Sequence, residues 1–246
     1  IAPHSLRAAT TQQLRDTLPF SASGPIHIHI AEQVKEVEDC LAFAGARPVE
    51  WLLDTMPVDG RWCLIHATHM TDAETRAMAR SGAVAGLCPI TEANLGDGVF
   101  NAPLFLAEGG HYGVGSDSNI LISLPEELRL LEYSQRLTRR ARNVIADRGG
   151  STGRMLFEQA GIGGNGALHS DIGLKIGGDA DIVALDRSRA PYLDEDRLLD
   201  HWIFAGGVSV DTVWAGGRKQ VENGRHVKHA AITGRFRKAI TDLLAD

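Results

Sequence analysis

The chain has 246 residues, of which 43% are hydrophobic and 23% charged, ordinary proportions for a globular protein. This composition excludes a disordered chain and a collagen-like or coiled-coil rod, and no apolar run approaches the roughly 20 residues of a transmembrane helix, so no membrane partner is expected. The 31 acidic residues outnumber the 25 basic ones, and the basic residues are scattered, which argues against a nucleic-acid partner.

The first 120 residues alternate short apolar runs with helical patterns. Strands are predicted at 1–4, 25–30, 62–66, 83–88 and 112–117, and helices at 5–18, 31–43 and 71–80. A capping box formed by Thr71 and Glu74 predicts where the last of these helices begins, and Gly82 where it ends. This alternation indicates βα units around a parallel sheet.

The second half of the chain changes in character. Helices are predicted at 125–146 and 152–160, followed by a strand at 182–185, turns at Gly216-Gly217 and Asn223-Gly224, and a helix at 236–244. We expect residues 1–165 to form one domain, and residues 166–246 to form a small β-rich domain with a terminal helix. The run Gly161-x-Gly163-x-x-Gly166 resembles a dinucleotide fingerprint, but a helical pattern precedes it where a strand is required. We interpret it as a helix end and linker.

The first residues and the cysteines support two further expectations, one about where the sequence begins and one about the location of the protein. Ile1 is preceded by no initiator methionine, and the first residues show no signal-peptide pattern, so we expect the sequence to begin within a domain. The three cysteines, Cys40, Cys63 and Cys88, form no CxxC pair, which favours reduced thiols and a cytoplasmic location.

Polar residues lie at the carboxyl ends of four predicted strands, where barrel enzymes keep their catalytic groups. A single histidine is more often structural, but four such ends in succession predict one shared site. The four ends are His4-Ser5-Leu6-Arg7, His27-Ile28-His29-Ile30-Ala31-Glu32, His66-Ala67-Thr68-His69 and Gly115-Ser116-Asp117-Ser118-Asn119.

The chemistry of these residues suggests a division of roles. Imidazole and carboxylate groups are standard ligands of Zn²⁺, so His29 and Asp117 are the predicted metal ligands. Glu32 lies beyond the strand end, where its carboxylate could reach a metal-bound water without binding the metal. His66 lies at the next strand end and could hydrogen-bond the same water.

Two further histidines have no predicted catalytic role. His27 shares a strand face with His29 but lies one pleat deeper, so we expect it to pack inside the wall of the sheet. His69 lies three residues beyond His66, and we expect it at the surface or behind the site.

This arrangement resembles the amidohydrolase superfamily, specifically its aminohydrolase branch, in which a His-x-x-Glu motif supplies a metal ligand and a proton shuttle. The motif His29-x-x-Glu32 and the Asp117 motif are typical of the superfamily. The segment His4-Ser5-Leu6-Arg7 resembles the corresponding segment of the members that act on N-formimino-L-glutamate. The resemblance implies an α/β protein with a (β/α)8 TIM-like barrel and a small appended β-rich domain. It also implies one Zn²⁺ per subunit and a homodimer.

The resemblance implies a reaction as well, the deimination of N-formimino-L-glutamate to N-formyl-L-glutamate and ammonia in histidine degradation. Asp117 would take up a proton from the zinc-activated water, and Glu32 would carry a proton to the departing nitrogen. His66 would orient the nucleophile. Arg7 would hold a carboxylate of this small-molecule substrate, assisted by His4.

Part of the superfamily pattern has no counterpart in this sequence. The His-x-His motif of the first barrel strand supplies two metal ligands, whereas the Glu32 that follows His27-Ile28-His29 marks the fifth-strand motif. A complete barrel needs about 250 residues, and five strand candidates precede the β-rich segment, so we expect about three units and the missing ligands upstream of Ile1. The alternative fold is a small doubly wound sheet. The alternative functions are an aminohydrolase acting on guanine or a nucleoside base, and a non-catalytic barrel.

Overall fold

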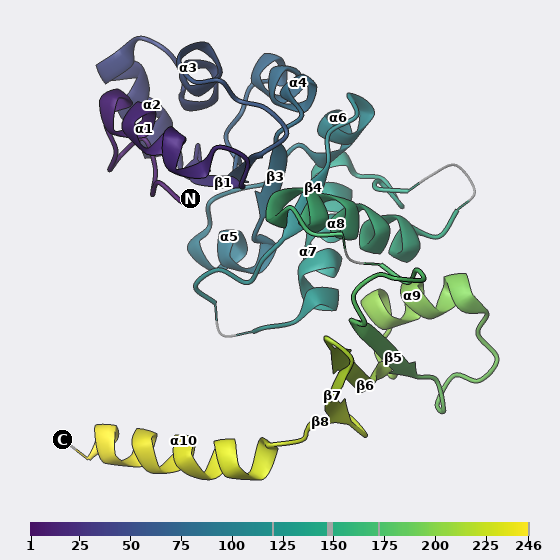
Figure 1. Cartoon of the computed structure of the whole chain (residues 1–246). Helices are drawn as coiled ribbons and strands as arrows, with labels where there is room; N and C mark the ends of the chain where they lie inside the picture. Colours follow the sequence, from purple (N-terminus) through teal and green to yellow (C-terminus); the bar gives the residue numbers. More distant parts are fainter. Residues whose placement is uncertain (120, 147–149, 172, 246) are drawn as a thin grey trace. The chain divides into compact units, whose positions relative to one another are not determined.

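The structure is a computed structural model that describes residues 1–119, 121–146, 150–171 and 173–245 (Figure 1). The chain divides into two compact units. The first comprises Ile1–Ser170 with Glu195–Ala205, and the second comprises Asp171–Asp194 with Gly206–Asp246. The first unit therefore extends past the expected boundary at residue 165 and also includes a later helix. Among the described residues, no helix is long and apolar enough to cross a bilayer.

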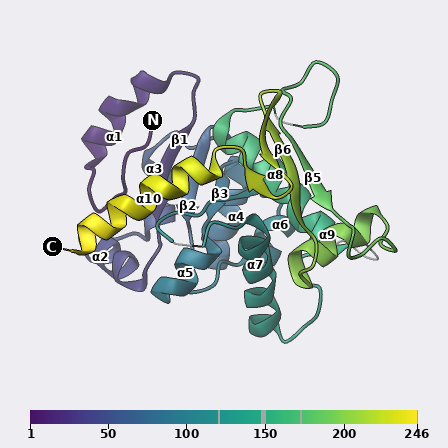
Figure 2. The ribbon, with the colours of Figure 1, turned by 90° about the horizontal axis from the view of Figure 1, so that it is seen from below.

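A parallel sheet of four strands lies at the centre of the first unit. Its strands are adjacent in chain order, as Figure 2 shows for the first three: β1 (Ile26–Ile30), β2 (Trp62–His66), β3 (Val84–Leu87) and β4 (Tyr112–Val114). All four were predicted, with ends that differ by at most three residues. Ile26, Ile28 and Ile30 are buried on one face of β1, and this alternation places His27 and His29 together on the other face.

Residues 1–5 lie beside β1 and correspond to the remaining predicted strand, at residues 1–4. The backbone N–H of His27 donates to the Ile1 carbonyl, and that of His29 donates to the His4 carbonyl, each at 3.0 Å. Ser5 forms an isolated parallel bridge with His29. The segment is thus paired with the sheet without forming a regular strand, and the pairing brings His4 next to His29.

Helices connect and follow the strands of this unit. The predicted capping box is confirmed, because the Thr71 hydroxyl accepts from the Glu74 N–H and Gly82 ends the helix with a φ of 82°. The helices are α1 (Thr11–Thr17), the short 3-10 helix η1 (Leu18–Ser21), α2 (Val34–Ala44), α3 (Pro48–Thr55), α4 (Asp72–Ser81), α5 (Pro89–Leu95), α6 (Ala102–Ala107), α7 (Leu124–Arg139), α8 (Thr152–Leu168) and α9 (Glu195–Phe204).

The helix predicted to begin at residue 5 begins at Thr11, and two predicted C-terminal helix ends are also wrong. The helix predicted to reach residue 146 ends at Arg139, because Arg140 adopts a left-handed conformation with a φ of 52°. The helix predicted to end at residue 160 continues as α8 to Leu168, so the glycine run is not a linker.

The glycines of α8 explain why it differs from the prediction. A side chain at Gly163 would clash with the carbonyl group of Tyr112, so glycine allows the backbone of α8 to pack directly against β4. The tertiary contact overrides the low intrinsic helix propensity of glycine. These glycines lie inside a helix and do not form the strand-to-helix turn that a dinucleotide site requires.

The second unit contains an antiparallel sheet and a terminal helix. Its strands pair in chain order: β5 (Ile182–Asp186), β6 (Ser209–Ala215), β7 (Arg218–Glu222) and β8 (Arg225–His226). The predicted turns at Gly216-Gly217 and Asn223-Gly224 connect β6 to β7 and β7 to β8, and all four turn residues have positive φ. The terminal helix, α10 (His229–Leu244), begins before the predicted residue 236.

Candidate active site

A cavity of about 250 Å³ lies where the polar residues at the ends of residues 1–5, β1, β2 and β4 meet. All six residues predicted for the site line this cavity, although their chemical roles stay predictions. The complete lining consists of His4, Arg7, His29, Glu32, His66, Thr91, Asn94, Leu95, Asp117 and Ser118.

Left-handed backbone turns direct several of these side chains. Ala31 directly after β1, His66 at the end of β2, Ala67 after it, and Asp117 beyond β4 have φ values of 49°, 68°, 47° and 45°. Residues other than glycine seldom adopt this conformation, and such strain gathers at functional sites. The strand ends are therefore built to present particular side chains at some cost in stability.

The turn after β1 is held in place by Glu36, a buried residue of α2. Its two carboxylate oxygens accept hydrogen bonds from the backbone N–H groups of Ala31 and Glu32, each at 3.0 Å. Backbone donors left over by the sharp turn are thereby satisfied inside the protein. The position of Glu32 is fixed by this contact.

Arg7 and Glu32 form an ion pair across the cavity wall. The Nη2 atom of Arg7 lies 2.9 Å from Oε2 of Glu32, and its Nε lies 3.9 Å from Oε2 of Glu36. The side chain of Arg7 is 38% exposed and that of Glu32 is 12% exposed. The predicted substrate anchor and the predicted proton carrier are therefore in direct contact.

His29 lies between two other imidazole rings. Its ring centroid is 5.1 Å from that of His4 and 5.7 Å from that of His66. Its Nδ1 lies 2.8 Å from the backbone carbonyl of His4. Because a carbonyl can only accept, Nδ1 carries the hydrogen and Nε2 keeps its lone pair, the arrangement typical of a metal-binding histidine.

His66 is 1% exposed and lies between two carboxylates. Its Nδ1 is 3.3 Å from Oε1 of Glu92, and its Nε2 is 3.7 Å from Oε1 of Glu32. Burial lowers the pKa of His66, but the hydrogen bond to Glu92 and the charges of Glu32, Glu92 and Asp117 outweigh burial and raise the pKa above its usual value.

Glu92 is a residue that the sequence analysis missed. It lies on α5, which follows β3, the one strand of the sheet whose end carries neither histidine nor aspartate. The Thr91-Glu92 pair in the first turns after that strand is the signal that could have revealed it. A search for carboxylates one helical turn beyond each strand would have included Glu92.

His27 and His69, the other two histidines at the predicted strand ends, lie outside the cavity lining given by the described residues. Nε2 of His27 is 2.7 Å from the carbonyl of Ala167 in α8, which agrees with a structural position on the sheet face. Nε2 of His69 is 2.7 Å from the carbonyl of Asp97, behind the site. Both rings are engaged by backbone groups.

The donor set fits a zinc ion in kind but not in number. His29 and Asp117 line one cavity and supply the nitrogen and oxygen donors that Zn²⁺ prefers, whereas a catalytic zinc usually has three protein ligands. Within the described part of the chain, no group of three or more His, Cys, Asp or Glu residues could hold a metal ion. The chain thus presents two candidate ligands.

Comparison with known families identifies the family to which this fold belongs. The sequence pattern of the Amidohydrolase family matches residues 1–219. The chain belongs to the amidohydrolase family. The predicted family and its α/β fold with a parallel sheet, related to the TIM barrel, are confirmed, while the partial barrel of five strands stays a prediction.

Several relatives of this amidohydrolase chain are known. Formimidoylglutamate deiminase of Pseudomonas aeruginosa is 50% identical over 98% of the chain and 54% of its own length. The 5-methylthioadenosine/S-adenosylhomocysteine deaminase of Bacillus cereus is 26% identical over 91% of the chain and 52% of its own length. The chain spans about half the length of these curated relatives.

Solved structures show the same fold. An amidohydrolase from Brucella melitensis superposes with a TM-score of 0.95 at 58% identity, over 99% of this chain and 55% of its own. An adenosine deaminase from Xanthomonas campestris with bound zinc superposes with a TM-score of 0.87 at 22% identity, over 100% of this chain and 57% of its own. The second similarity concerns the fold alone.

Proposed function

We propose that the protein is a metal-dependent hydrolase that converts N-formimino-L-glutamate to N-formyl-L-glutamate and ammonia in histidine degradation. The observation that carries the proposal is a single cavity that holds an arginine, a glutamate and the candidate zinc ligands, Arg7, Glu32, His29 and Asp117. The 50% identity to a formimidoylglutamate deiminase supports it.

The metal would be held by His29 and Asp117 from this chain. We propose one Zn²⁺ per subunit, with further ligands from a part of the protein outside these 246 residues. When bound, the ion would lower the pKa of water and so make a nucleophile available at neutral pH. The hydrogen bond from Nδ1 of His29 to the His4 carbonyl would keep Nε2 available for this purpose.

The protein's own carboxylates would move the protons. Asp117 would accept a proton from the attacking water, and Glu32 would carry protons to the =NH nitrogen of the formimino group. Both protons of the water would thereby reach this nitrogen, which then leaves as ammonia. The oxygen of the water becomes the carbonyl oxygen of the formyl product. His66, 3.7 Å from Glu32, would orient the nucleophile.

Substrate selection would depend on Arg7. The guanidinium group can hold a carboxylate of glutamate in a bidentate contact, with His4 beside it. In this structure the same group is engaged by Glu32 at 2.9 Å. An arriving substrate carboxylate would compete for Arg7 and leave Glu32 free to move a proton.

A direct assay tests the proposal. The full-length protein should release ammonia from N-formimino-L-glutamate and form N-formyl-L-glutamate. A ring-acting deaminase would instead release ammonia from a guanine or methylthioadenosine substrate, and a non-catalytic barrel would release none from either. Activity on the ring substrates alone would refute the proposed substrate.

The proposal also includes a homodimer in the cytoplasm, as the resemblance implies. Sedimentation of the full-length protein would give its oligomeric state, and cell fractionation would give its location. A monomer, or a protein recovered outside the cytoplasmic fraction, would contradict the corresponding part.

A further inference from the structure

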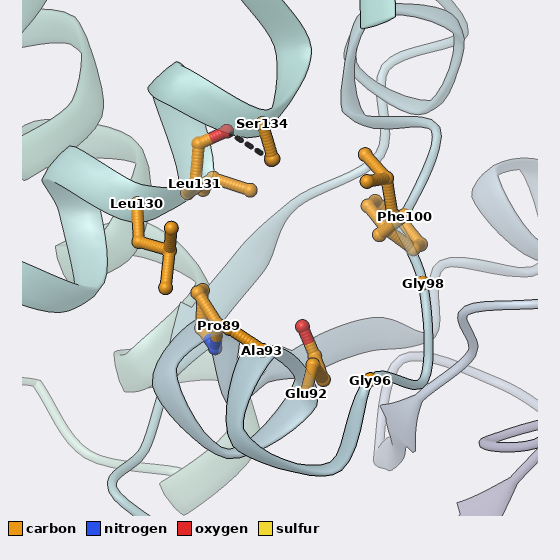
Figure 3. A pocket seen from close by; sticks show the side chains of 10 residues that line it. Pro89, Glu92, Ala93, Gly96, Gly98, Phe100, Leu130, Leu131 and Ser134 are labelled. Carbon is orange, nitrogen blue, oxygen red and sulfur yellow. Dashed lines mark hydrogen bonds between the residues drawn. The ribbon is translucent and has the colours of Figure 1, made fainter. Parts of the chain in front are cut away.

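Glu92 separates the candidate active site from a second cavity. Its side chain is 6% exposed, and its carboxylate contacts His66 on one side. On the other side it points into a cavity of about 260 Å³, as Figure 3 shows. The surroundings of Glu92 in that cavity are mostly apolar and include Pro89, Ala93, Val99, Phe100, Leu130 and Leu131.

The hydrogen bonds of Glu92 determine which nitrogen of His66 carries a hydrogen. Oε1 of Glu92 accepts the backbone N–H of Cys88 at 2.9 Å and lies 3.3 Å from Nδ1 of His66. An ionised carboxylate oxygen can only accept, so Nδ1 is the donor in this pair. Nε2 is then the ring nitrogen that faces the cavity and Glu32.

We propose that Glu92 is a positioning residue that holds the imidazole of His66 with Nε2 towards the reacting atoms. Without this acceptor, rotation about the Cβ–Cγ bond would exchange the places of the ring's nitrogen and carbon atoms at little cost. A buried carboxylate behind a catalytic histidine removes that freedom. What the positioned ring does in the reaction rests on the proposed function, whereas the contact itself does not.

The competing explanation is that Glu92 only stabilises the start of α5. A matched control exists for this role, because Glu127 also accepts a backbone N–H at the same helix start. Its Oε2 lies 2.8 Å from the N atom of Ile90, and it is 3% exposed. Glu127 therefore shares the structural role of Glu92, while its hydrogen bonds run to Ile90 and Asn119.

The experiment compares Glu92→Leu, Glu92→Gln and Glu127→Leu in the full-length protein. In Glu92→Leu we expect kcat for N-formimino-L-glutamate to fall by about 10- to 100-fold, as for other residues that orient a catalytic group. KM should stay near that of the wild type, because Glu92 contacts His66 and lies outside the described lining of the substrate cavity. Glu92→Gln keeps an oxygen that accepts from Nδ1, and should recover most of kcat.

A second measurement, by NMR, detects the contact between Glu92 and His66 without any enzymatic turnover. In metal-free protein with ¹⁵N-labelled histidine rings, the Nδ1–H of His66 should give a protected proton signal, assigned by its loss in His66→Asn. The signal should persist in Glu92→Gln and Glu127→Leu and disappear in Glu92→Leu. A merely structural role would make Glu92→Leu and Glu127→Leu behave alike in this spectrum.

Two results would overturn the proposal: an unchanged kcat in Glu92→Leu, or a His66 signal that survives this substitution. If Glu92→Leu does not fold, Glu92→Asp replaces it, since the shorter side chain keeps the charge but withdraws from Nδ1. Absence of ammonia release by the wild type would refute the proposed function, and the spectrum would still decide the role of Glu92.

Discussion

Glu32 offers a way to separate proton transfer from metal binding at the level of one side chain. Replacing it with glutamine removes a proton carrier and leaves His29 and Asp117 untouched. We expect turnover of the full-length protein to fall by roughly 10²-fold or more, as for a lost general acid or base, while zinc content measured by elemental analysis stays normal. Loss of zinc in Glu32→Gln would instead make Glu32 a ligand, and His29→Ala provides the matched variant expected to lose zinc.

Arg7 tests substrate identity at the same scale. Arg7→Met would leave a substrate carboxylate without its partner, and breaking a buried charge pair costs about 3–5 kcal/mol. Because Arg7 is 38% exposed, we expect the low end of this range, or roughly a 10²-fold loss in kcat/KM.

The loss in Arg7→Met should be small for a formimino compound without carboxylates. The exposed Arg15 of α1 supplies a control, Arg15→Met, with wild-type kinetics expected. Equal kcat/KM values for wild type and Arg7→Met on N-formimino-L-glutamate would remove Arg7 as the anchor.

Prediction from sequence worked for residues whose position follows from a strand end. His29, His66 and Asp117 each come at or just beyond a β-strand, and parallel strands bring their carboxyl ends to one edge, so their convergence was predictable. The contribution of Glu92 was not predictable, because Glu92 reaches the site from a helix and belongs to no histidine or aspartate motif at a strand end. The ion pair between Arg7 and Glu32 was equally hidden, since it joins residues 25 positions apart.

At the scale of elements, the close packing of α8 against β4 can be tested by substituting its glycines. In Gly163→Ala the new methyl group would meet the backbone of Tyr112, so we expect a loss of about 1–3 kcal/mol in the free energy of unfolding. Gly161 lies in the same helix, and a methyl group added there would have no neighbouring atom within 4 Å. Gly161→Ala should therefore be neutral or stabilising by up to about 1 kcal/mol.

Urea titration of the full-length variants measures both effects. Similar midpoints for Gly161→Ala and Gly163→Ala would show that helix propensity, and not contact with β4, governs this segment. Opposite shifts are the expected outcome.

The elements that were predicted well are defined by residues within or next to the element itself. The capping box at Thr71 and the left-handed glycine at Gly82 define α4 within one residue, and the apolar run from Trp62 to His66 coincides with β2. α8 was predicted too short because its glycines favour a helix only through their close packing against β4, a contact that the local sequence does not show. The helices α5 and α6, of seven and six residues, are too short to show a helical period and were not predicted, and α3 and α9 were not predicted either.

For the whole molecule, the decisive expectation concerns the metal. Dialysis of the full-length protein against a chelator should abolish ammonia release, and added Zn²⁺ should restore it, because two of its ligand types are already present in His29 and Asp117. Asp117→Asn is expected to resist restoration. Full activity in protein shown by elemental analysis to be metal-free would refute the metal-dependent mechanism.

The left-handed turns at the strand ends also constrain how this family could change its substrate during evolution. Ala31 and Ala67 are fully buried and have positive φ, so larger or β-branched residues there would meet both a packing barrier and a backbone barrier. Asn94, Leu95 and Ser118 line the same cavity, are exposed and have negative φ. New specificities are therefore accessible through these three positions while the strand ends that hold the predicted catalytic groups stay unchanged. Libraries that vary the three should retain folded protein far more often than libraries that vary Ala31 or Ala67.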